Sequence, residues 1–139
     1  MALRDAIARL QVHAGSLVGM KEAPTDPPES ANQFPFALSY VRAGSWRAES
    51  AGFSHAFVTL VTEIHVARSA LPLDIQLALP FFEPFLQKLL GDQTLNGTMD
   101  NIGEVEFSFG SMKYAGQPTL GWQFVISGPD GAGAKVTIT

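Results

Sequence analysis

The stretch FSHAFVTLVTEIHVARSALPLDIQLALPFFEPFLQKLL, residues 53–90, decides the fold because its hydrophobic period changes part-way along it. Up to residue 66 the side chains alternate between two faces, and this period of two fits a β-strand but not a helix. One face carries Ala56, Val58, Leu60, Ile64 and Val66, and the other carries Phe57, Thr59, Val61, Glu63 and His65. We therefore predict a long strand over residues 53–66.

The second half of the same stretch predicts an apolar helix that prolines interrupt. Ser69 can cap this helix, and Pro72 stands near a first helical position, where no backbone N–H is needed. Pro80 and Pro84 each remove a helical hydrogen bond, so we expect a kinked helix or two short ones. Apolar residues recur at steps of three and four, namely Ile75, Leu79, Phe82, Leu86 and Leu89. The strand and helix carry few reactive side chains, which indicates packing and assembly rather than an active site.

Composition places the chain among single-domain globular proteins. It has 139 residues, of which 46% are hydrophobic and 16% charged, and we treat residues 1–139 as one domain. The absence of cysteine excludes disulfide and thiolate chemistry. A formal net charge of −4 argues against a dedicated nucleic-acid binder, which needs a basic face. The N-terminus lacks an apolar signal core, and no apolar run approaches the roughly 18 residues of a membrane span.

The remaining elements complete a mixed fold. An amphipathic pattern predicts a first helix that ends near Gly19, and the proline-rich residues 22–33 predict a surface loop. We expect further strands over residues 34–42, 104–113, 120–127 and 135–139, with a turn or wide hairpin tip from Gly44 to Gly52. Short turns between strands favour antiparallel pairing. The prediction is an α+β fold in the order α-β-β-α-β-β-β, with a mainly antiparallel four- to five-stranded sheet and two main helices packed on one face.

The chemical motifs point away from catalysis. Glu63 and His65 share a strand face with His55, but ten residues of strand separate the two histidines by roughly 33 Å, too far for one metal site. We interpret Glu63 and His65 as an ion pair on a wet or interfacial sheet face. The sequence GAGAK at residues 131–135 lacks the spacing and the Ser or Thr of a phosphate loop. We expect no metal, no cofactor and no enzymatic activity.

Trp46 and Arg47 stand together at the expected hairpin tip. Tryptophan and arginine dominate the binding energy of many protein interfaces, so this pair is a candidate anchor for a partner. The alternative is a tryptophan that folds back over the edge of the sheet.

Four stretches, taken in order, resemble a known family. They are residues 23–40, from Ala23-Pro24 through Phe34-Pro35-Phe36-Ala37 to Tyr40; residues 57–72, from Phe57-Val58-Thr59 to Leu71-Pro72; residues 95–98, Leu95-Asn96-Gly97-Thr98; and residues 109–116, Phe109-Gly110-Ser111-Met112-Lys113-Tyr114-Ala115-Gly116. Together they resemble the phage tail terminator proteins, also called minor tail or tail completion proteins. The resemblance extends over about three quarters of the chain and carries no catalytic motif.

The resemblance implies a structural role in the virion. Tail terminators form a ring, typically six-fold, on the head-proximal end of the tail tube, where they stop tube growth and present a surface to the head connector. The implied partners are further copies of the chain, the major tail tube protein and a connector or head-closure protein, assembled in the bacterial cytoplasm. Genomic DNA would pass through the ring without specific binding, and no membrane is involved. Two alternatives stay open: another neck or tail component, and a small-molecule-binding α+β domain with a ligand near Glu63 and His65.

Two sets of residues follow from this interpretation. Asp92, Asp100, Glu104 and Glu106 form an acidic run without intervening Lys or Arg, and they are candidates for a channel wall that repels DNA phosphate. The candidate subunit interface comprises Trp46, Arg47, Glu63, His65 and Arg68. If these interface residues lie on the surface, Trp46→Ala or Arg68→Glu should leave the subunit folded and abolish ring assembly.

Overall fold

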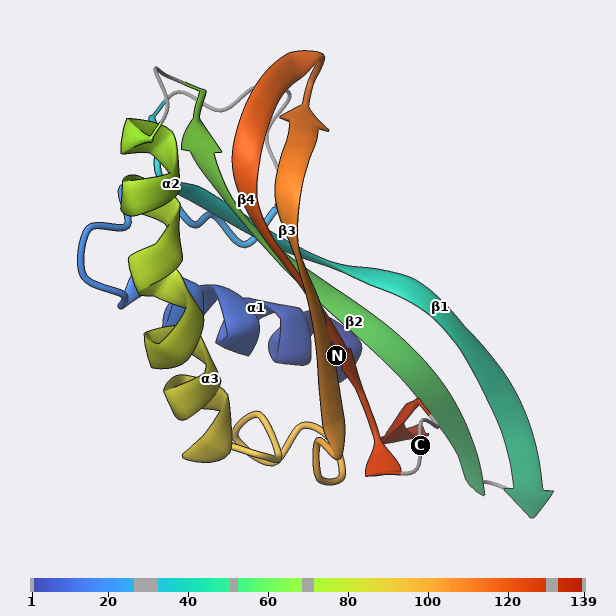
Figure 1. Ribbon diagram of the computed structural model, residues 1–139. Helices are drawn as coiled ribbons and strands as arrows, with labels where there is room; N and C mark the ends of the chain where they lie inside the picture. The colour runs from blue at the N-terminus through green and yellow to red at the C-terminus, as the bar shows by residue number, and fades with distance from the viewer. Residues whose placement is uncertain (1, 27–32, 51–52, 69–71, 130–132, 139) are drawn as a thin grey trace.

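The computed structural model describes residues 2–26, 33–50, 53–68, 72–129 and 133–138, and it has the predicted α+β architecture (Figure 1). The helical elements are α1 (Ala2–Gly15), α2 (Leu73–Ala78), the 3-10 turn η1 (Leu79–Phe81) and α3 (Phe82–Leu90). The strands are β1 (Phe36–Ser50), β2 (Phe53–Ala67), β3 (Glu104–Tyr114), β4 (Gln117–Ser127) and β5 (Ala134–Ile138). The predicted order of elements is confirmed.

A five-stranded antiparallel sheet in the order β1-β2-β4-β3 forms one layer, and β5 also pairs with β2. One edge of β2 pairs with β1 along nearly its whole length. The other edge is shared, because residues 60–67 pair with β4 and residues 54–58 pair with β5. β1 and β2 extend together beyond the helices (Figure 1), and we call residues 43–50 of β1 with residues 53–59 of β2 the arm.

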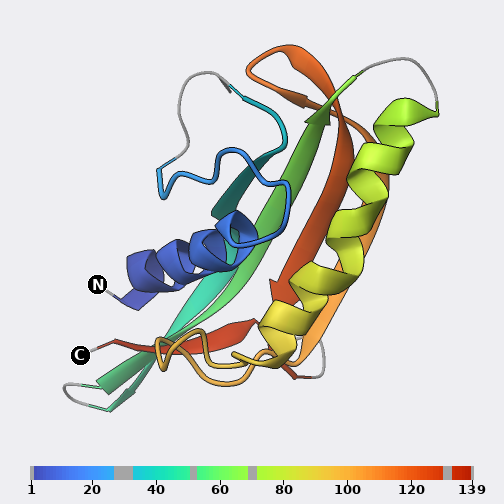
Figure 2. The same cartoon turned by 90° about the vertical axis from the view of Figure 1, so that its left-hand side faces the viewer.

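Both helical segments cover the same face of the sheet, as predicted (Figures 1 and 2). Because side chains alternate along a strand, this face receives the even-numbered residues of β2 and β4 and the odd-numbered residues of β3. The buried core joins the helices to these strands through residues such as Leu10, Ile64, Phe85, Phe124 and Ile126. We call the opposite side of the sheet, which carries Glu63, the helix-free face.

The predicted proline-broken helix is confirmed, and the sheet compensates for the break. Around Pro80 the chain tightens into η1, so the backbone N–H of Phe82 donates to the carbonyl of Leu79. The carbonyl of Ala78 instead accepts a hydrogen bond from Nε1 of Trp122 at 2.9 Å. A side chain of β4 thereby fixes the point at which α2 gives way to α3.

The predicted core stripe of this helix is only partly right. The fully or nearly buried positions are Ala78, Phe81, Phe85 and Leu89, whereas Leu79 is 48% exposed. The buried positions begin with Asp74 and keep steps of three and four through η1. The buried stripe therefore lies one residue before the predicted one from the start of α2 to Phe85, and the two coincide at Leu89.

The β1–β2 hairpin differs from the prediction at its tip. Residues 44–46 do not begin a turn: β1 continues through them to Ser50, with Trp46 opposite Ala56. A register shift between Val41 and Ala43 marks where the arm begins. The β3–β4 hairpin closes through Ala115 and Gly116, which both have positive φ (52° and 82°), as a two-residue turn of right-handed twist needs.

Buried polar contacts hold α1 on the sheet. Gln11 Nε2 donates to the carbonyls of Pro24 (2.6 Å) and Ala37 (3.0 Å), and its Oε1 accepts from the hydroxyl of Ser39 (2.7 Å). The predicted loop 22–33 starts with ordered contacts, since Glu22 forms a parallel bridge with Phe36. Residues 27–32 of this loop lie outside the described residues.

Candidate functional site

A polar cluster centred on Glu63 occupies the helix-free face. Glu63 Oε1 lies 2.8 Å from Nε2 of His65, and Glu63 Oε2 accepts hydrogen bonds from the hydroxyl of Tyr40 and, at 3.3 Å, from Nε2 of Gln123. His65 Nδ1 lies 2.6 Å from the hydroxyl of Thr119. Three neighbouring strands, β1, β2 and β4, therefore contribute to one hydrogen-bonded network.

The hydrogen bonds of this cluster fix its charge state. Burial alone would raise the pKa of Glu63, but the bonds from His65, Tyr40 and Gln123 outweigh burial and hold that pKa below its usual value. Burial, together with the bond to Glu63 and its negative charge, raises the pKa of Tyr40 to about 12. Tyr40 therefore remains a protonated donor and Glu63 an ionised acceptor near neutral pH.

The structure corrects the placement of Glu63 and His65 on a wet face. His65 is fully buried, and the side chain of Glu63 is 14% exposed. The ring of Tyr114 lies 6.0 Å from that of His65 and 4.9 Å from that of Phe36, so the end of β3 covers this part of the face. The predicted contact between Glu63 and His65 is present, but it is buried within the subunit. Because His65 has no exposed surface, it cannot contact a neighbouring subunit.

The alternative of a ligand site near this cluster has little geometric support. Both carboxylate oxygens of Glu63 are already engaged by protein groups. Of three surface hollows of about 560, 320 and 310 Å³, none is lined by Glu63 or His65, and only the smallest is lined by a member of the cluster, Tyr40. Within the described residues, no three His, Asp or Glu side chains gather closely enough to hold a metal ion.

None of the described helices combines the length and apolar character that a membrane crossing requires.

Trp46 and Arg47 both lie on the arm rather than at its tip. The side chain of Trp46 is 64% exposed, so the alternative of a tryptophan folded over the sheet edge is not what the structure shows. Arg47 is also exposed, and its guanidinium carbon lies 5.5 Å from the ring centroid of Phe57 on the same side of the arm. The predicted anchor pair is thus available to a partner.

Arg68, the last predicted interface residue, has a role inside the subunit. Its Nε lies 3.7 Å from Oδ2 of Asp74, a residue with no exposed surface. Asp74 Oδ1 accepts the backbone N–H of Ile75 at 2.9 Å in the first turn of α2. Arg68 supplies the positive charge beside a buried carboxylate, so it is not a purely external group.

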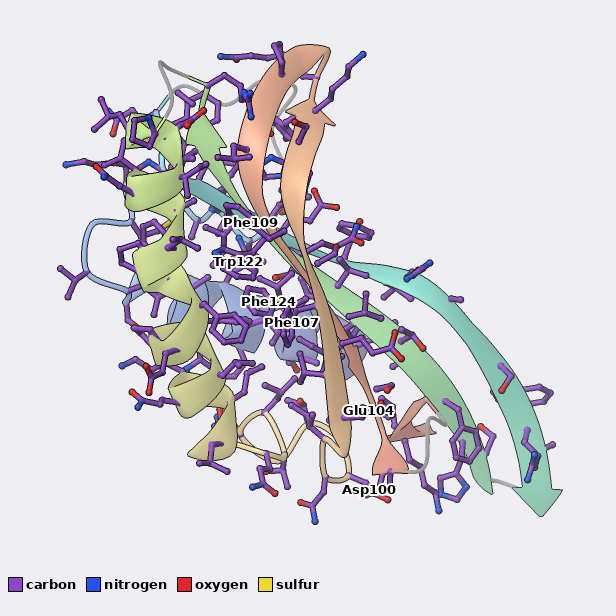
Figure 3. The ribbon with its side chains drawn as sticks, in the orientation of Figure 1. Asp100, Glu104, Phe107, Phe109, Trp122 and Phe124 are labelled. Carbon is purple, nitrogen blue, oxygen red and sulfur yellow. The ribbon has the colours of Figure 1, made fainter. Side chains whose placement is uncertain are left out.

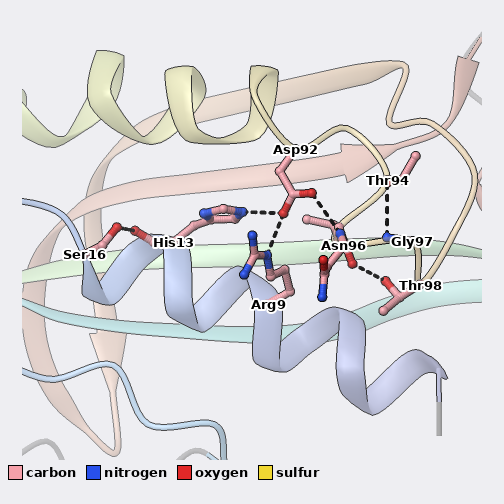
Figure 4. Close-up of polar contacts among 9 residues, drawn as sticks. Arg9, His13, Ser16, Asp92, Thr94, Asn96, Gly97 and Thr98 are labelled. Atoms are coloured by element: carbon pink, nitrogen blue, oxygen red, sulfur yellow. Dashed lines mark hydrogen bonds and ion pairs between the residues drawn. The ribbon is translucent and has the colours of Figure 1, made fainter.

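The acidic run divides into one neutralised residue and three exposed ones. Asp92 is not free to line a channel, because Arg9 Nε and His13 Nε2 of α1 each lie 2.7 Å from its Oδ2 (Figure 4). Its Oδ1 accepts the backbone N–H of Asn96 at 2.8 Å. Burial would raise the pKa of Asp92, but these hydrogen bonds and the charge of Arg9 lower it to about 2.

The three exposed acidic residues lie along one end of the sheet edge. Asp100 and Glu104 sit at the lower end of β3 in Figure 3, and Glu106 follows two residues further along the strand.

The same strand carries two exposed phenylalanines, which the sequence pattern did not predict. Phe107 and Phe109, which alternate as core residues would, are 55% and 36% exposed. Their exposure follows from the position of β3 at the edge of the sheet.

The Asp92 cluster predicts a defined dependence of stability on pH. A folded-state pKa of about 2, below the ordinary value of 3.8, contributes stability that is present above about pH 4 and is lost as pH falls through 2. We expect Asp92→Asn to lower the free energy of unfolding by about 1 to 2 kcal/mol at about pH 6, with the difference from the original protein shrinking toward zero at about pH 2. Urea unfolding at a series of pH values measures this gap. If the difference in free energy of unfolding between Asp92→Asn and the original protein is the same at about pH 2 and at about pH 6, the lowered pKa of Asp92 would be contradicted.

Comparison of the chain with protein-family models finds no match, and neither does comparison with curated proteins.

Proposed function

We propose that this chain is a structural virion protein that caps the head-proximal end of a phage tail tube as a ring, stops tube polymerisation and forms the docking surface for the head connector. The observation that carries the proposal is the arm, a β-hairpin that extends past the helices (Figure 1). Trp46, which lies on the arm, is exposed. Large exposed aromatic residues beside an arginine are typical of interface hot spots. In a ring subunit, such an arm is the element that reaches a neighbour.

Other features support an assembly role rather than catalysis. In the most prominent polar cluster, both carboxylate oxygens of Glu63 are engaged in hydrogen bonds within the subunit. The two edge strands, β1 and β3, lie on opposite sides of the sheet, so one subunit offers two different surfaces. A head-to-tail ring requires two such surfaces, provided that the rotation between subunits closes.

The proposed partners follow from this role. They are further copies of the chain in a six-membered ring, together with the major tail tube protein and the connector or head-closure protein. Asp100 and Glu104 are exposed, and they remain candidates for a channel wall past which DNA slides without specific binding. The ring would be assembled in the host cytoplasm and carried in the neck of the virion.

Removal of the Trp46 side chain tests the proposal. We expect Trp46→Ala to change the free energy of unfolding by under about 0.5 kcal/mol, because the residue is mostly exposed. Ring formation should fall sharply, and complemented phage should carry overlong tubes or tails without heads. Tail lengths in electron micrographs give the readout, and circular dichroism gives the folding control.

Val18→Ala is the matched control, since Val18 is 98% exposed just after α1 and belongs to neither the arm nor the β3 edge. Tails of normal length that join heads in both variants would count against the arm as the assembly element. Normal tube length with failed head joining in Trp46→Ala alone would instead favour a head-closure component.

A further inference from the structure

The two edges of the sheet are open along much of their length. In the described residues, the arm portion of β1 pairs with β2 alone, and β3 pairs with β4 alone. An unpaired strand edge presents a row of backbone N–H and C=O groups that can pair with another strand. Neither segment, residues 43–50 or residues 104–114, contains a proline that would block such pairing.

The side chains on these two edges are complementary. The arm presents exposed Trp46 and Arg47, and the β3 edge presents exposed Glu106 and Phe107. Each edge thus has an exposed aromatic residue directly next to an exposed charged residue, and the two charges are opposite. Opposite charges across strands stabilise pairing, and so do aromatic pairs.

The faces of the sheet also match. Trp46 is opposite Ala56 in the β1–β2 register and therefore lies on the helix-covered face, as Phe107 does. Arg47, opposite His55, lies on the helix-free face, as Glu106 does. A sheet that continues from one copy into the next, with the helices kept on one side, therefore brings aromatic to aromatic and charge to charge.

The strand directions agree with such a continuation. Each successive pair in the order β1-β2-β4-β3 is antiparallel, so β1 and β3 run in opposite directions. When a second copy is added in the same orientation, its β1 runs antiparallel to the β3 of the first. In an antiparallel ladder, a step forward on one strand is a step back on the other. Trp46 opposite Phe107 therefore implies Arg47 opposite Glu106.

We propose that the arm of one copy of this chain adds antiparallel to the β3 edge of the next copy, with Trp46 opposite Phe107 and Arg47 opposite Glu106. The inference rests on the proposed ring and names its subunit contact. It also assigns Glu106 to this contact rather than to the channel wall.

The positions toward the start of the arm fit this register, whereas at its far end Glu49 falls opposite Glu104. Gly44 then lies opposite Phe109, which leaves room for the aromatic ring, and Ser45 lies opposite Ser108. A shift by two residues keeps the faces but loses the match. In one direction Arg47 meets Ser108, and in the other it meets Glu104 while Gly44, not Trp46, faces Phe107.

Exchange of the two charges tests the contact. In sedimentation of the concentrated protein, Arg47→Glu and Glu106→Arg should each weaken self-association about tenfold, because like charges then face each other. An equimolar mixture of the two variants should restore it, since arm and edge are again opposite in charge at every contact of an alternating ring. Glu104→Arg, on the same face of β3 two residues away, is the matched control; in this register position 104 falls opposite Glu49, so its charge reversal should not weaken association. A mixture that does not recover, or an equal loss in Glu104→Arg, would overturn the register.

Cysteine pairs test the register directly, because the chain has no cysteine of its own. Under mild oxidation, Ser45→Cys with Ser108→Cys should give a ladder of disulfide-linked oligomers, since directly opposite residues lie within disulfide reach. Ser45→Cys with Ser111→Cys, displaced along the strand and on the other face, should give far fewer. Equal yields from the two pairs, or no oligomers from either, would overturn the proposal.

The two proposals can fail separately. One outcome is that charge exchange and cross-linking behave as expected while phage complemented with Trp46→Ala have normal tails. That result would support the subunit contact and contradict the tail-capping function. If Trp46→Ala abolishes tail termination, but charge exchange does not change self-association and the cysteine pairs give no linked oligomers, the tail-capping function is supported and this subunit contact is contradicted.

Discussion

Replacing Gly121 with alanine is expected to lower the free energy of unfolding by about 3 kcal/mol or more, because it forces apart the two central strands. Gly121 of β4 is opposite His65 of β2, and a Cβ atom added to it would overlap the carbonyl oxygen of Ile64 and lie 2.9 Å from its carbonyl carbon. Those atoms are backbone, so no side-chain rotation relieves the clash. The β2–β4 ladder, and with it the core between these strands and α3, must shift.

Gly110→Ala provides a matched control for this prediction. Gly110 is the cross-strand partner of Gly121 on β3, but a Cβ atom added there meets nothing within 4 Å. The variant should be neutral, or more stable by about 0.5 kcal/mol through the reduced freedom of the unfolded chain. Urea unfolding midpoints compare the two. Similar midpoints for both variants would show that β4 can move away from β2 at little cost.

The second large effect is expected for Arg68→Glu, which should destabilise the subunit by about 2 to 4 kcal/mol. This outcome reverses the sequence-based expectation that the variant stays folded and loses only assembly. The reason is Asp74, whose fully buried carboxylate would then face a second negative charge in place of the Arg68 guanidinium. The start of α2 depends on this carboxylate, which accepts the N–H of Ile75.

A second substitution separates charge from packing in this prediction. Asp74→Asn keeps an oxygen acceptor for Ile75 but removes the buried charge, so Arg68→Glu combined with Asp74→Asn should recover most of the lost stability. Thermal unfolding of the two single variants and the double variant gives the coupling between the sites. Additive effects would mean that Arg68 acts through something other than Asp74.

Local pattern was sufficient for the strands and for the broken helix. The alternation over residues 53–66 predicted β2 because a period of two leaves no helical solution, and Pro80 and Pro84 predicted the break because each lacks a backbone N–H. The same local reasoning failed at residues 44–46. Glycine and serine suggested a turn there, but pairing with β2 holds them in an extended strand.

Burial and charge state were beyond local pattern, because they depend on distant partners. The sequence around Glu63 and His65 is typical of a solvent-exposed face. In the structure, however, Tyr40 of β1 and Gln123 of β4 donate hydrogen bonds to Glu63. Asp92 belongs to an acidic run in sequence, yet Arg9 neutralises it from a helix more than 80 residues earlier. The exposure of Phe107 depended on the order of strands in the sheet, which no spacing within β3 encodes.

The contacts of α1 set an order of events during synthesis. This 14-residue helix, too short to be stable alone in water, packs on β1 and β2 and also on β5, and its Arg9 and His13 bind Asp92 (Figure 4). A ribosome adds about 5 to 20 residues per second, so the helix leaves the exit tunnel seconds before its later partners exist. β1 and β2 can cover part of α1 early, but the contacts of α1 with Asp92 and β5 are complete only after residue 138 has left the ribosome.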